Sequence, residues 1–109
     1  MPVSAERTSP CPLERVVEMI DGKWKVLILW HLRDECLRFS ELRRKIPGVS
    51  QKMLTEKLRQ LEFSQLIQRT IYPEIPPRVE YTLTDKGVNL KPLLLLINDW
   101  GHSFFAHSR

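Results

Sequence analysis

The sequence of 109 residues lacks the features that mark membrane-spanning and secreted proteins. No apolar run approaches the roughly 20 residues needed to cross a bilayer. The first ten residues, "MPVSAERTSP", contain no apolar stretch of the kind found in a signal peptide. These absences predict a cytoplasmic protein with no membrane partner.

Cysteine is also scarce, with only Cys11 and Cys36 in the chain. Two cysteines in a cytoplasmic protein are poor evidence for a structural disulfide, and no group of Cys and His residues has the spacing of metal ligands. The sequence shows no nucleophile with a placed base, no oxyanion-hole motif and no phosphate-binding loop. We therefore expect no metal, no cofactor and no enzymatic activity.

Internal repeats, low-complexity tracts and linkers are absent as well. The length suits one domain, which we place at residues 11–109 after a flexible segment of residues 1–10. A domain of this size buries only about two-thirds of the surface that its unfolded chain exposes. Oligomerisation would add to that burial.

Positive charge is concentrated in one part of the chain. The net charge is +4, and residues 38–60 contain seven basic residues against two acidic ones, so the rest of the chain sums to −1. Such an asymmetry is typical of a surface that binds the phosphates of nucleic acid. A solvated face rich in Lys and Arg is the alternative reading of the charge alone.

The spacing of apolar residues predicts a mainly helical α+β fold. Helices are expected at residues 12–20, 23–33, 41–46, 51–62 and 85–108, and strands at residues 66–72 and 78–84. Ser40, Ser50 and Thr84 are the expected N-caps of the last three helices. The turn "PGV" joins the third and fourth helices into a helix-turn-helix, and the two strands form a β-hairpin with a proline-rich tip. This order predicts a winged helix-turn-helix with a two-stranded hairpin wing and with dimerisation helices at both ends of the chain.

The stretch "SQKMLTEKLRQLE" is the expected recognition helix. Leu54, Leu58 and Leu61 share one face and belong to a core. The opposite face carries the residue types that read bases in a major groove: Arg and Lys pair with guanine or phosphate, Gln with adenine, and Thr contacts the thymine methyl. The predicted groove contacts are Gln51, Lys52, Thr55 and Arg59, with Glu56 beside them.

Four further residues are candidate DNA contacts at the edges of this surface. Ser50 suits either a helix cap or a phosphate contact, and Ser40 and Arg43 would position the protein on the backbone. Arg78, next to the prolines of the wing, would reach a minor groove or a phosphate. The alternative for Arg78 is an edge-strand charge that prevents pairing between sheets.

Apolar residues near the C-terminus exceed what one small domain needs. The stretch "PLLLLINDW" indicates a partner helix from a second subunit. Trp100, Phe104 and Phe105 fit the core and the dimer interface better than a ligand cage.

Four stretches, "CPLERVVEMIDGKWKVLILWHL", "RFSELRRKIPGVSQKMLTEKLRQLE", "YPEIPPRVEYTLTDKG" and "INDWG", resemble the HxlR family of winged-helix transcription regulators, relatives of the MarR type. The resemblance covers about residues 11–101. It implies a DNA-binding homodimer that acts as a repressor or an activator of nearby genes, and we expect a repressor-like action. A two-fold dimer in turn predicts an inverted-repeat operator in double-stranded DNA. The resemblance also implies that the first and last helices form the dimer interface.

Cys11 is the candidate sensor residue. In some members of the resembled family the matching cysteine senses oxidants or electrophiles. Cys11 directly precedes Pro12, and the positive end of a helix dipole stabilises a thiolate, the attacking form of cysteine. An inert N-terminal cysteine and a small-molecule effector bound elsewhere remain alternatives. Cys36 departs from the family pattern, which more often has a small residue there.

A winged-helix module that binds protein is the competing function. The basic helix-turn-helix and Arg78 argue against it. Charge reversal at Lys52 and Arg59 separates the two functions, because it would leave protein binding intact and abolish DNA binding.

Overall fold

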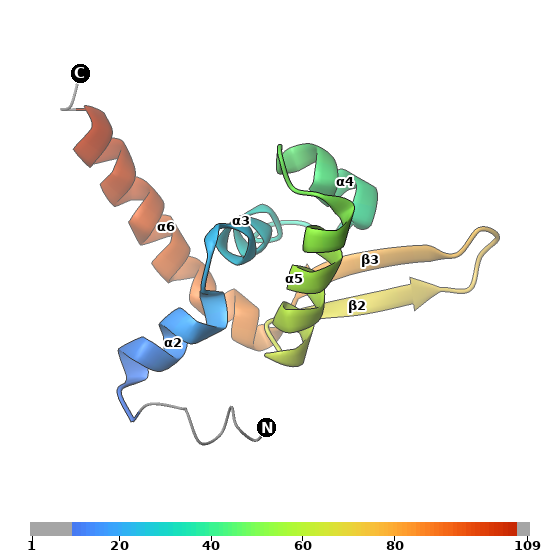
Figure 1. The fold of residues 1–109 in the computed structure, drawn as a ribbon, viewed down its shortest axis with the longest axis horizontal. Helices are drawn as coiled ribbons and strands as arrows, with labels where there is room; N and C mark the ends of the chain where they lie inside the picture. The colour runs from blue at the N-terminus through green and yellow to red at the C-terminus, as the bar shows by residue number, and fades with distance from the viewer. Residues whose placement is uncertain (1–9, 107–109) are drawn as a thin grey trace.

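The computed structural model describes residues 10–106. Of the predicted flexible segment, residues 1–9 lie outside this range. The elements follow one another as α2 (Pro12–Ile20), α3 (Lys23–His31), β1 (Leu37–Arg38), α4 (Phe39–Lys45), α5 (Gln51–Phe63), β2 (Ile67–Tyr72), β3 (Arg78–Leu83) and α6 (Asp85–Ala106). Figure 1 shows the mainly helical winged helix-turn-helix that the sequence predicts.

Helix α4 begins earlier than predicted, and Ser40 is not its N-cap. The N-cap is Arg38, so Ser40 lies within the first turn of the helix. The Oε1 atom of Glu41 accepts a hydrogen bond from the backbone N–H of Arg38 at 2.8 Å, which satisfies a donor that the helix itself leaves free. The carboxylate of Glu41 therefore fixes the start of α4 two residues before the predicted cap.

Helix α5 has the start and the inward face that its sequence predicts. Ser50 is the N-cap, and its Oγ accepts a hydrogen bond from the N–H of Met53 at 3.0 Å. Leu54, Leu58 and Leu61 are buried. Because this apolar stripe points inward, the polar side chains of α5 face away from the core.

The sheet has three antiparallel strands in the order β1-β3-β2 rather than the two of the predicted hairpin. The extended residues before α4 form the third strand, in which Leu37 pairs with Tyr81. Strands β2 and β3 pair from Ile67 opposite Leu83 to Tyr72 opposite Arg78. The hairpin projects from the body of the protein as the wing (Figure 1).

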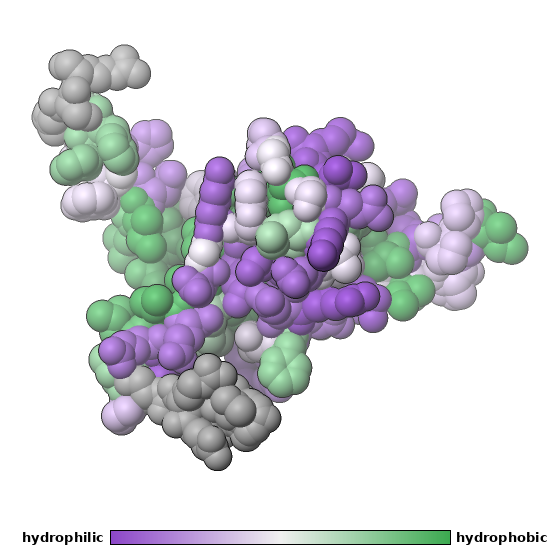
Figure 2. Space-filling model, viewed as in Figure 1, coloured by the Kyte–Doolittle hydropathy of each residue, from purple (hydrophilic) through white to green (hydrophobic). Residues whose placement is uncertain are grey.

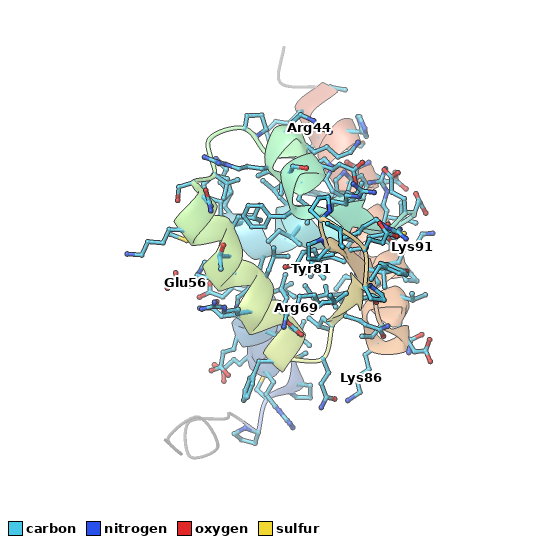
Figure 3. All side chains as sticks on the ribbon, turned by 90° about the vertical axis from the view of Figure 1, so that its right-hand side faces the viewer. Arg44, Glu56, Arg69, Tyr81, Lys86 and Lys91 are labelled. Carbon is cyan, nitrogen blue, oxygen red and sulfur yellow. The ribbon has the colours of Figure 1, made fainter. Side chains whose placement is uncertain are left out.

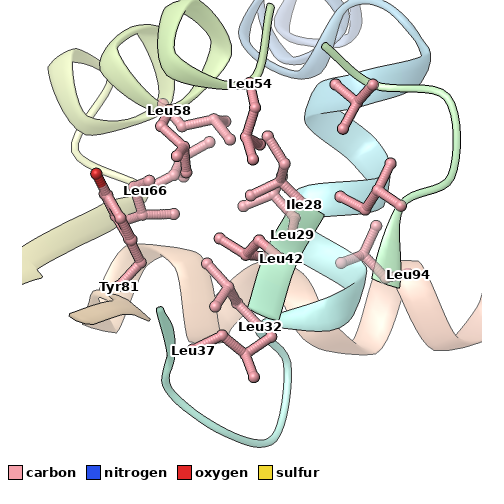
Figure 4. Packing of buried hydrophobic residues seen from close by; sticks show 14 residues of the cluster. Ile28, Leu29, Leu32, Leu37, Leu42, Leu54, Leu58, Leu66, Tyr81 and Leu94 are labelled. Atoms are coloured by element: carbon pink, nitrogen blue, oxygen red, sulfur yellow. The ribbon is translucent and has the colours of Figure 1, made fainter. Parts of the chain in front are cut away.

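Helix α3 lies at the centre of the core. Ile28 and Leu29 are completely buried and face Leu54 and Leu58 of α5 (Figure 4). The helix ends at His31, two residues before its predicted end, where the N–H of Leu32 bonds to the carbonyl of Ile28 at 3.0 Å. Packing against α3 holds the recognition helix in a fixed orientation.

Helix α6 is anchored to the core only at its beginning. Thr84 caps it as predicted: its Oγ1 accepts from the N–H of Gly87 at 3.1 Å and donates to the carbonyl of Gln65 at 2.6 Å. Leu94 is buried, whereas the remainder of the helix extends away from the body (Figure 1). In the part of the chain that the structure describes, no helix is long and apolar enough to cross a membrane.

Candidate nucleic-acid interface

The outer face of α5 is a polar surface with a shallow hollow. Gln51, Lys52 and Arg59 are exposed and Thr55 is half-buried. These four side chains line the hollow together with Glu56 and Gln60. Figure 2 shows hydrophilic side chains gathered over this part of the molecule. All four predicted groove contacts therefore lie together on one accessible face.

The cations of this face are not neutralised by neighbouring carboxylates. Within residues 10–106, Arg43, Lys52 and Arg59 form no ion pair. In contrast, Arg69 pairs with Glu62 at 3.8 Å. Uncompensated guanidinium and ammonium groups attract phosphates, and their attraction falls as salt increases.

Helix α4 flanks the recognition helix. Ser40 and Arg43 are both exposed on it. Figure 3 shows α4 beside α5, with Arg44 near the end of α4 and Glu56 directed outward from α5. The structure thus places the predicted positioning residues on the element that precedes the reading face, as helix-turn-helix geometry requires.

Arg78 lies at the base of the wing tip and is held by neighbouring side chains. Its Nη2 lies 2.9 Å from Oε2 of Glu74, and its Nη1 lies 2.6 Å from Oε2 of Glu80. The guanidinium carbon also lies 3.9 Å from the ring centroid of Tyr72. The hydrogen bond from Arg78 lowers the pKa of Glu74, and the two carboxylates raise the pKa of Arg78. The predicted wing contact is therefore already engaged within the wing.

Sequence reasoning missed one cation near the wing. Arg38 is exposed on the edge strand β1 and pairs in register with Glu80 of β3. Its charge also contributes to lowering the pKa of Glu74. The register of β1 on β3 brings Arg38 to this position, and the signal in the sequence was the extended "LR" before α4.

A second surface, on α2 and α6, is apolar. In α2 no residue is buried, and Leu13 and Val17 are exposed. On α6, Leu96, Ile97 and Trp100 are exposed, and Figure 2 shows hydrophobic side chains over these helices. We refer to Leu13, Val17, Leu96, Ile97, Trp100, Phe104 and Phe105 as the apolar face.

The aromatic residues of the apolar face do not contribute to the core of the monomer. Trp100 and Phe104 stack with ring centroids 5.0 Å apart, and Phe105 meets Phe104 edge-on at 5.1 Å. All three are exposed. They lie outside the core of the single chain, because α6 has left the body of the protein before it reaches them. The prediction of a dimer interface still stands.

The two cysteines are both exposed. Cys11 is the N-cap of α2, as predicted from Pro12, and lies close in sequence to Leu13 of the apolar face. Cys36 lies between α3 and β1. Within residues 10–106 no group of three or more His, Cys, Asp or Glu residues is arranged to hold a metal ion.

These elements define a class of protein. A buried three-helix core, an exposed polar second helix of a helix-turn-helix and a hairpin wing together make a winged helix-turn-helix of the kind found in transcription regulators.

Comparison with known proteins gives the family. Residues 19–109 match the HxlR-like helix-turn-helix family. The chain is 52% identical, over 89% of its length and 74% of the relative's, to an uncharacterized HTH-type transcriptional regulator of Methanothermobacter thermautotrophicus. The chain belongs to the HxlR-like helix-turn-helix family of transcriptional regulators, which are not enzymes.

Solved structures agree with this assignment. The redox regulator HypR in its oxidized form is 43% identical, with a TM-score of 0.82 over 85% of this chain and 96% of HypR. The reduced form of the transcriptional regulator YodB from B. subtilis is 37% identical, with a TM-score of 0.76 over 88% of this chain and 95% of YodB. The match extends over nearly all of the described elements.

Proposed function

We propose that this regulator binds a specific inverted-repeat operator as a homodimer and acts in a repressor-like way on nearby genes, with oxidant sensing through Cys11. The observation that carries the proposal is the outer face of α5. There, Gln51, Lys52 and Arg59 are exposed, and neither cation is paired with a carboxylate within the described residues. Charged side chains alone would suffice for solubility. This face also carries Gln51, whose amide can pair with adenine, beside cations that can pair with guanine.

Each part of the interface has its own role. Helix α5 enters the major groove, where Arg59 and Lys52 bind guanine or phosphate, Gln51 pairs with adenine and Thr55 contacts thymine. The exposed Ser40 and Arg43 of α4 bind the backbone, and the amides at the start of α5 beside Ser50 suit a phosphate. Arg78 lies in the wing, which reaches the neighbouring part of the duplex.

The apolar face supports the homodimer. Two copies joined through it by a two-fold axis would present two α5 helices to one side of the duplex. Half-sites about one helical turn apart, or a multiple of that distance, would match this arrangement. The operator would therefore be an inverted repeat.

Oxidant sensing is supported by the place of Cys11 and by its relatives. Cys11 is exposed and is the N-cap residue of α2. Two thiols that join as a disulfide give two electrons and two protons to the oxidant. Because α2 carries part of the apolar face, such a bond would change how two subunits pack. HypR is described as a redox regulator.

A mobility-shift titration with the DNA upstream of the gene tests the proposal. Lys52→Glu and Arg59→Glu should each weaken the discrete complex by at least about fivefold, since each base-reading or phosphate-binding cation contributes on the order of 1–3 kcal/mol. Lys86→Glu is the matched control, because Lys86 is an exposed cation at the start of α6, away from the outer face of α5 (Figure 3). Control and wild type should bind alike.

The same titration with the oxidant diamide tests the sensor. We expect diamide to remove the complex of the wild type and of Cys36→Ser, and to leave that of Cys11→Ser intact. A complex that ignores diamide would refute the thiol switch and leave the DNA-binding proposal standing. Equal binding by Lys52→Glu and wild type would refute the assignment of α5 as the reading helix.

A further inference from the structure

The tip of the wing carries an apolar side chain that no residue of the described range 10–106 covers. Strand β2 ends at Tyr72 and strand β3 begins at Arg78. The loop that joins the two strands contains Pro73, Pro76 and Pro77. Ile75 is fully exposed, at 101% of its reference area. Figure 2 shows this hydrophobic tip at the end of the projecting wing, separated from the rest of the molecule.

The tip is also stiff. Proline fixes one backbone angle at three of its five positions, and the N–H of Glu74 bonds to the carbonyl of Tyr72 at 2.8 Å. A loop with little conformational freedom loses little entropy when it docks. An exposed isoleucine on a rigid projection can therefore contribute most of its burial energy to a partner.

The two carboxylates of the wing share Arg78 and stand near a second cation, the exposed Arg38 of β1, which is in register with Glu80. The guanidinium of Arg78 contacts the carboxylates of Glu74 and Glu80 and covers the ring of Tyr72. The carboxylate of Glu74, which would otherwise repel DNA, is thus neutralised beside the tip. No uncompensated cation remains between Tyr72 and Glu80 to bind a phosphate. The chemistry that the tip offers is apolar.

We propose that Ile75 makes an apolar contact with the floor of a DNA minor groove flanking the α5 site and selects A·T pairs there. This rests on the proposed DNA-binding function and gives the wing its own sequence preference. A G·C pair carries the same acceptors on the groove floor as an A·T pair and adds the protruding N2 amino group of guanine. An aliphatic side chain clashes with that amino group. It also shields the amino N–H from water and accepts no hydrogen bond from it, so this donor is left unsatisfied.

Minor-groove proteins frequently place apolar side chains against the bases, as wedges at deformable steps. The position of the wing favours DNA over a protein partner, because β2 follows directly from α5 and packs against it. The wing is therefore attached to the helix that enters the duplex in the proposed function.

Fluorescence anisotropy with three operator duplexes tests the proposal. The base pairs that the wing covers, located by footprinting, are A·T in the first duplex, G·C in the second and inosine·C in the third. Inosine lacks the N2 amino group and otherwise matches guanine. Wild type should lose about fivefold or more in affinity on G·C, in line with the usual cost of one unfavourable pair, and recover it on inosine·C.

Ile75→Ser should bind the three duplexes equally. The matched control is Ile71→Ser, since Ile71 is also exposed, at 57%, and lies within β2 rather than in the loop of residues 73–77. Ile71→Ser should retain the preference of the wild type. Both side chains are exposed, so neither substitution removes core packing.

Three results would overturn the proposal. Ile75→Ser could keep the A·T preference, wild type could fail to recover on inosine·C, or Glu74→Gln could tighten binding while Arg78→Gln alone abolishes the preference. The last result would show that Arg78 leaves its carboxylates and reads the groove itself. Failure of the DNA-binding proposal looks different, because wild type would then bind none of the duplexes and Arg59→Glu would change nothing.

Discussion

At the scale of single residues, Gly87 shows how closely α6 approaches the body of the protein. Its backbone N–H is capped by Thr84, and the residue is buried. A Cβ at this position would collide with the carbonyl oxygen of Leu66 and lie 3.2 Å from the side chain of Leu83. The packing of the start of α6 against the body of the protein therefore requires glycine at position 87.

Gly87→Ala should therefore destabilise the protein by about 1–3 kcal/mol, because overpacking outweighs the roughly 1 kcal/mol that alanine gains over glycine in a helix. Urea denaturation followed by circular dichroism measures this difference. The control is Asn89→Ala, an exposed position of the same helix, which should be neutral or slightly stabilising. A stable Gly87→Ala variant would mean that α6 shifts at no cost.

Two serines show what a sequence reveals about single positions. Ser50 was predicted as an N-cap and is one, because its Oγ reaches the N–H of Met53. Ser40 has the same chemistry, yet the side chain of Glu41 already satisfies the N–H of Arg38. Capping depends on which of several short-range hydrogen bonds forms, and composition alone does not decide between them.

At the scale of elements, α6 is tied to the segment after α3 by charged groups. Nζ of Lys91 lies 2.6 Å from Oδ1 of Asp34, although 57 positions separate them in sequence. Arg33 contacts Asp34 at 3.5 Å, donates to the carbonyl of Trp30 at 2.7 Å and stacks on its ring. These contacts connect the anchored half of α6 to the end of the central helix.

This connection predicts a dependence of stability on pH. The hydrogen bond from Lys91 lowers the pKa of Asp34 in the folded state, so the unfolded chain takes up the proton first as the pH falls. The stabilisation is complete above the unfolded pKa of about 4 and is lost as the pH falls through the lower folded pKa. Between pH 5 and pH 3, wild type should lose more stability than Asp34→Asn, measured by urea midpoints.

Asp99→Asn is the control for this measurement, because Asp99 is an exposed carboxylate of α6 that forms no ion pair within the described residues. It should follow the wild type. If Asp34→Asn and wild type lose stability in parallel, the pair with Lys91 does not form in solution.

Elements with strong periodicity were predictable, and contacts between elements were not. The stripe of Leu54 and Leu58 defined α5 and its reading face. The pairing of Lys91 with Asp34 joins two elements 57 positions apart in the chain, which no local pattern encodes. The assignments of Lys52 and Arg59 to DNA remain predictions.

At the scale of the whole molecule, polar and apolar surfaces are separated. The hydrophilic face lies over α5, and the apolar face lies on α2 and the far half of α6 (Figures 1 and 2). Apolar patches of this kind are typical of surfaces that another chain covers. Because these two surfaces are separate, association of two copies through the apolar face would leave α5 accessible.

Leu96→Asp should convert the proposed dimer to a monomer, since it places a charge on a residue that is 66% exposed within the apolar face. Sedimentation velocity measures the change, and operator affinity should fall with it. Phe63→Asp is the control: Phe63 is 86% exposed at the end of α5, outside the apolar face, and its variant should remain dimeric. A dimeric Leu96→Asp variant would place the interface elsewhere.

In the proposed homodimer, the projecting half of α6 would make the abundance of the protein part of its regulation. The apolar side chains of this half of α6 are exposed in the single chain, and in the proposed homodimer they would pack only against a second copy. The melting temperature of such a protein rises with its concentration by mass action. Where most of the chain is monomeric, occupancy of a two-fold operator follows the square of the monomer concentration, so a twofold change in synthesis or a round of cell division is itself a signal.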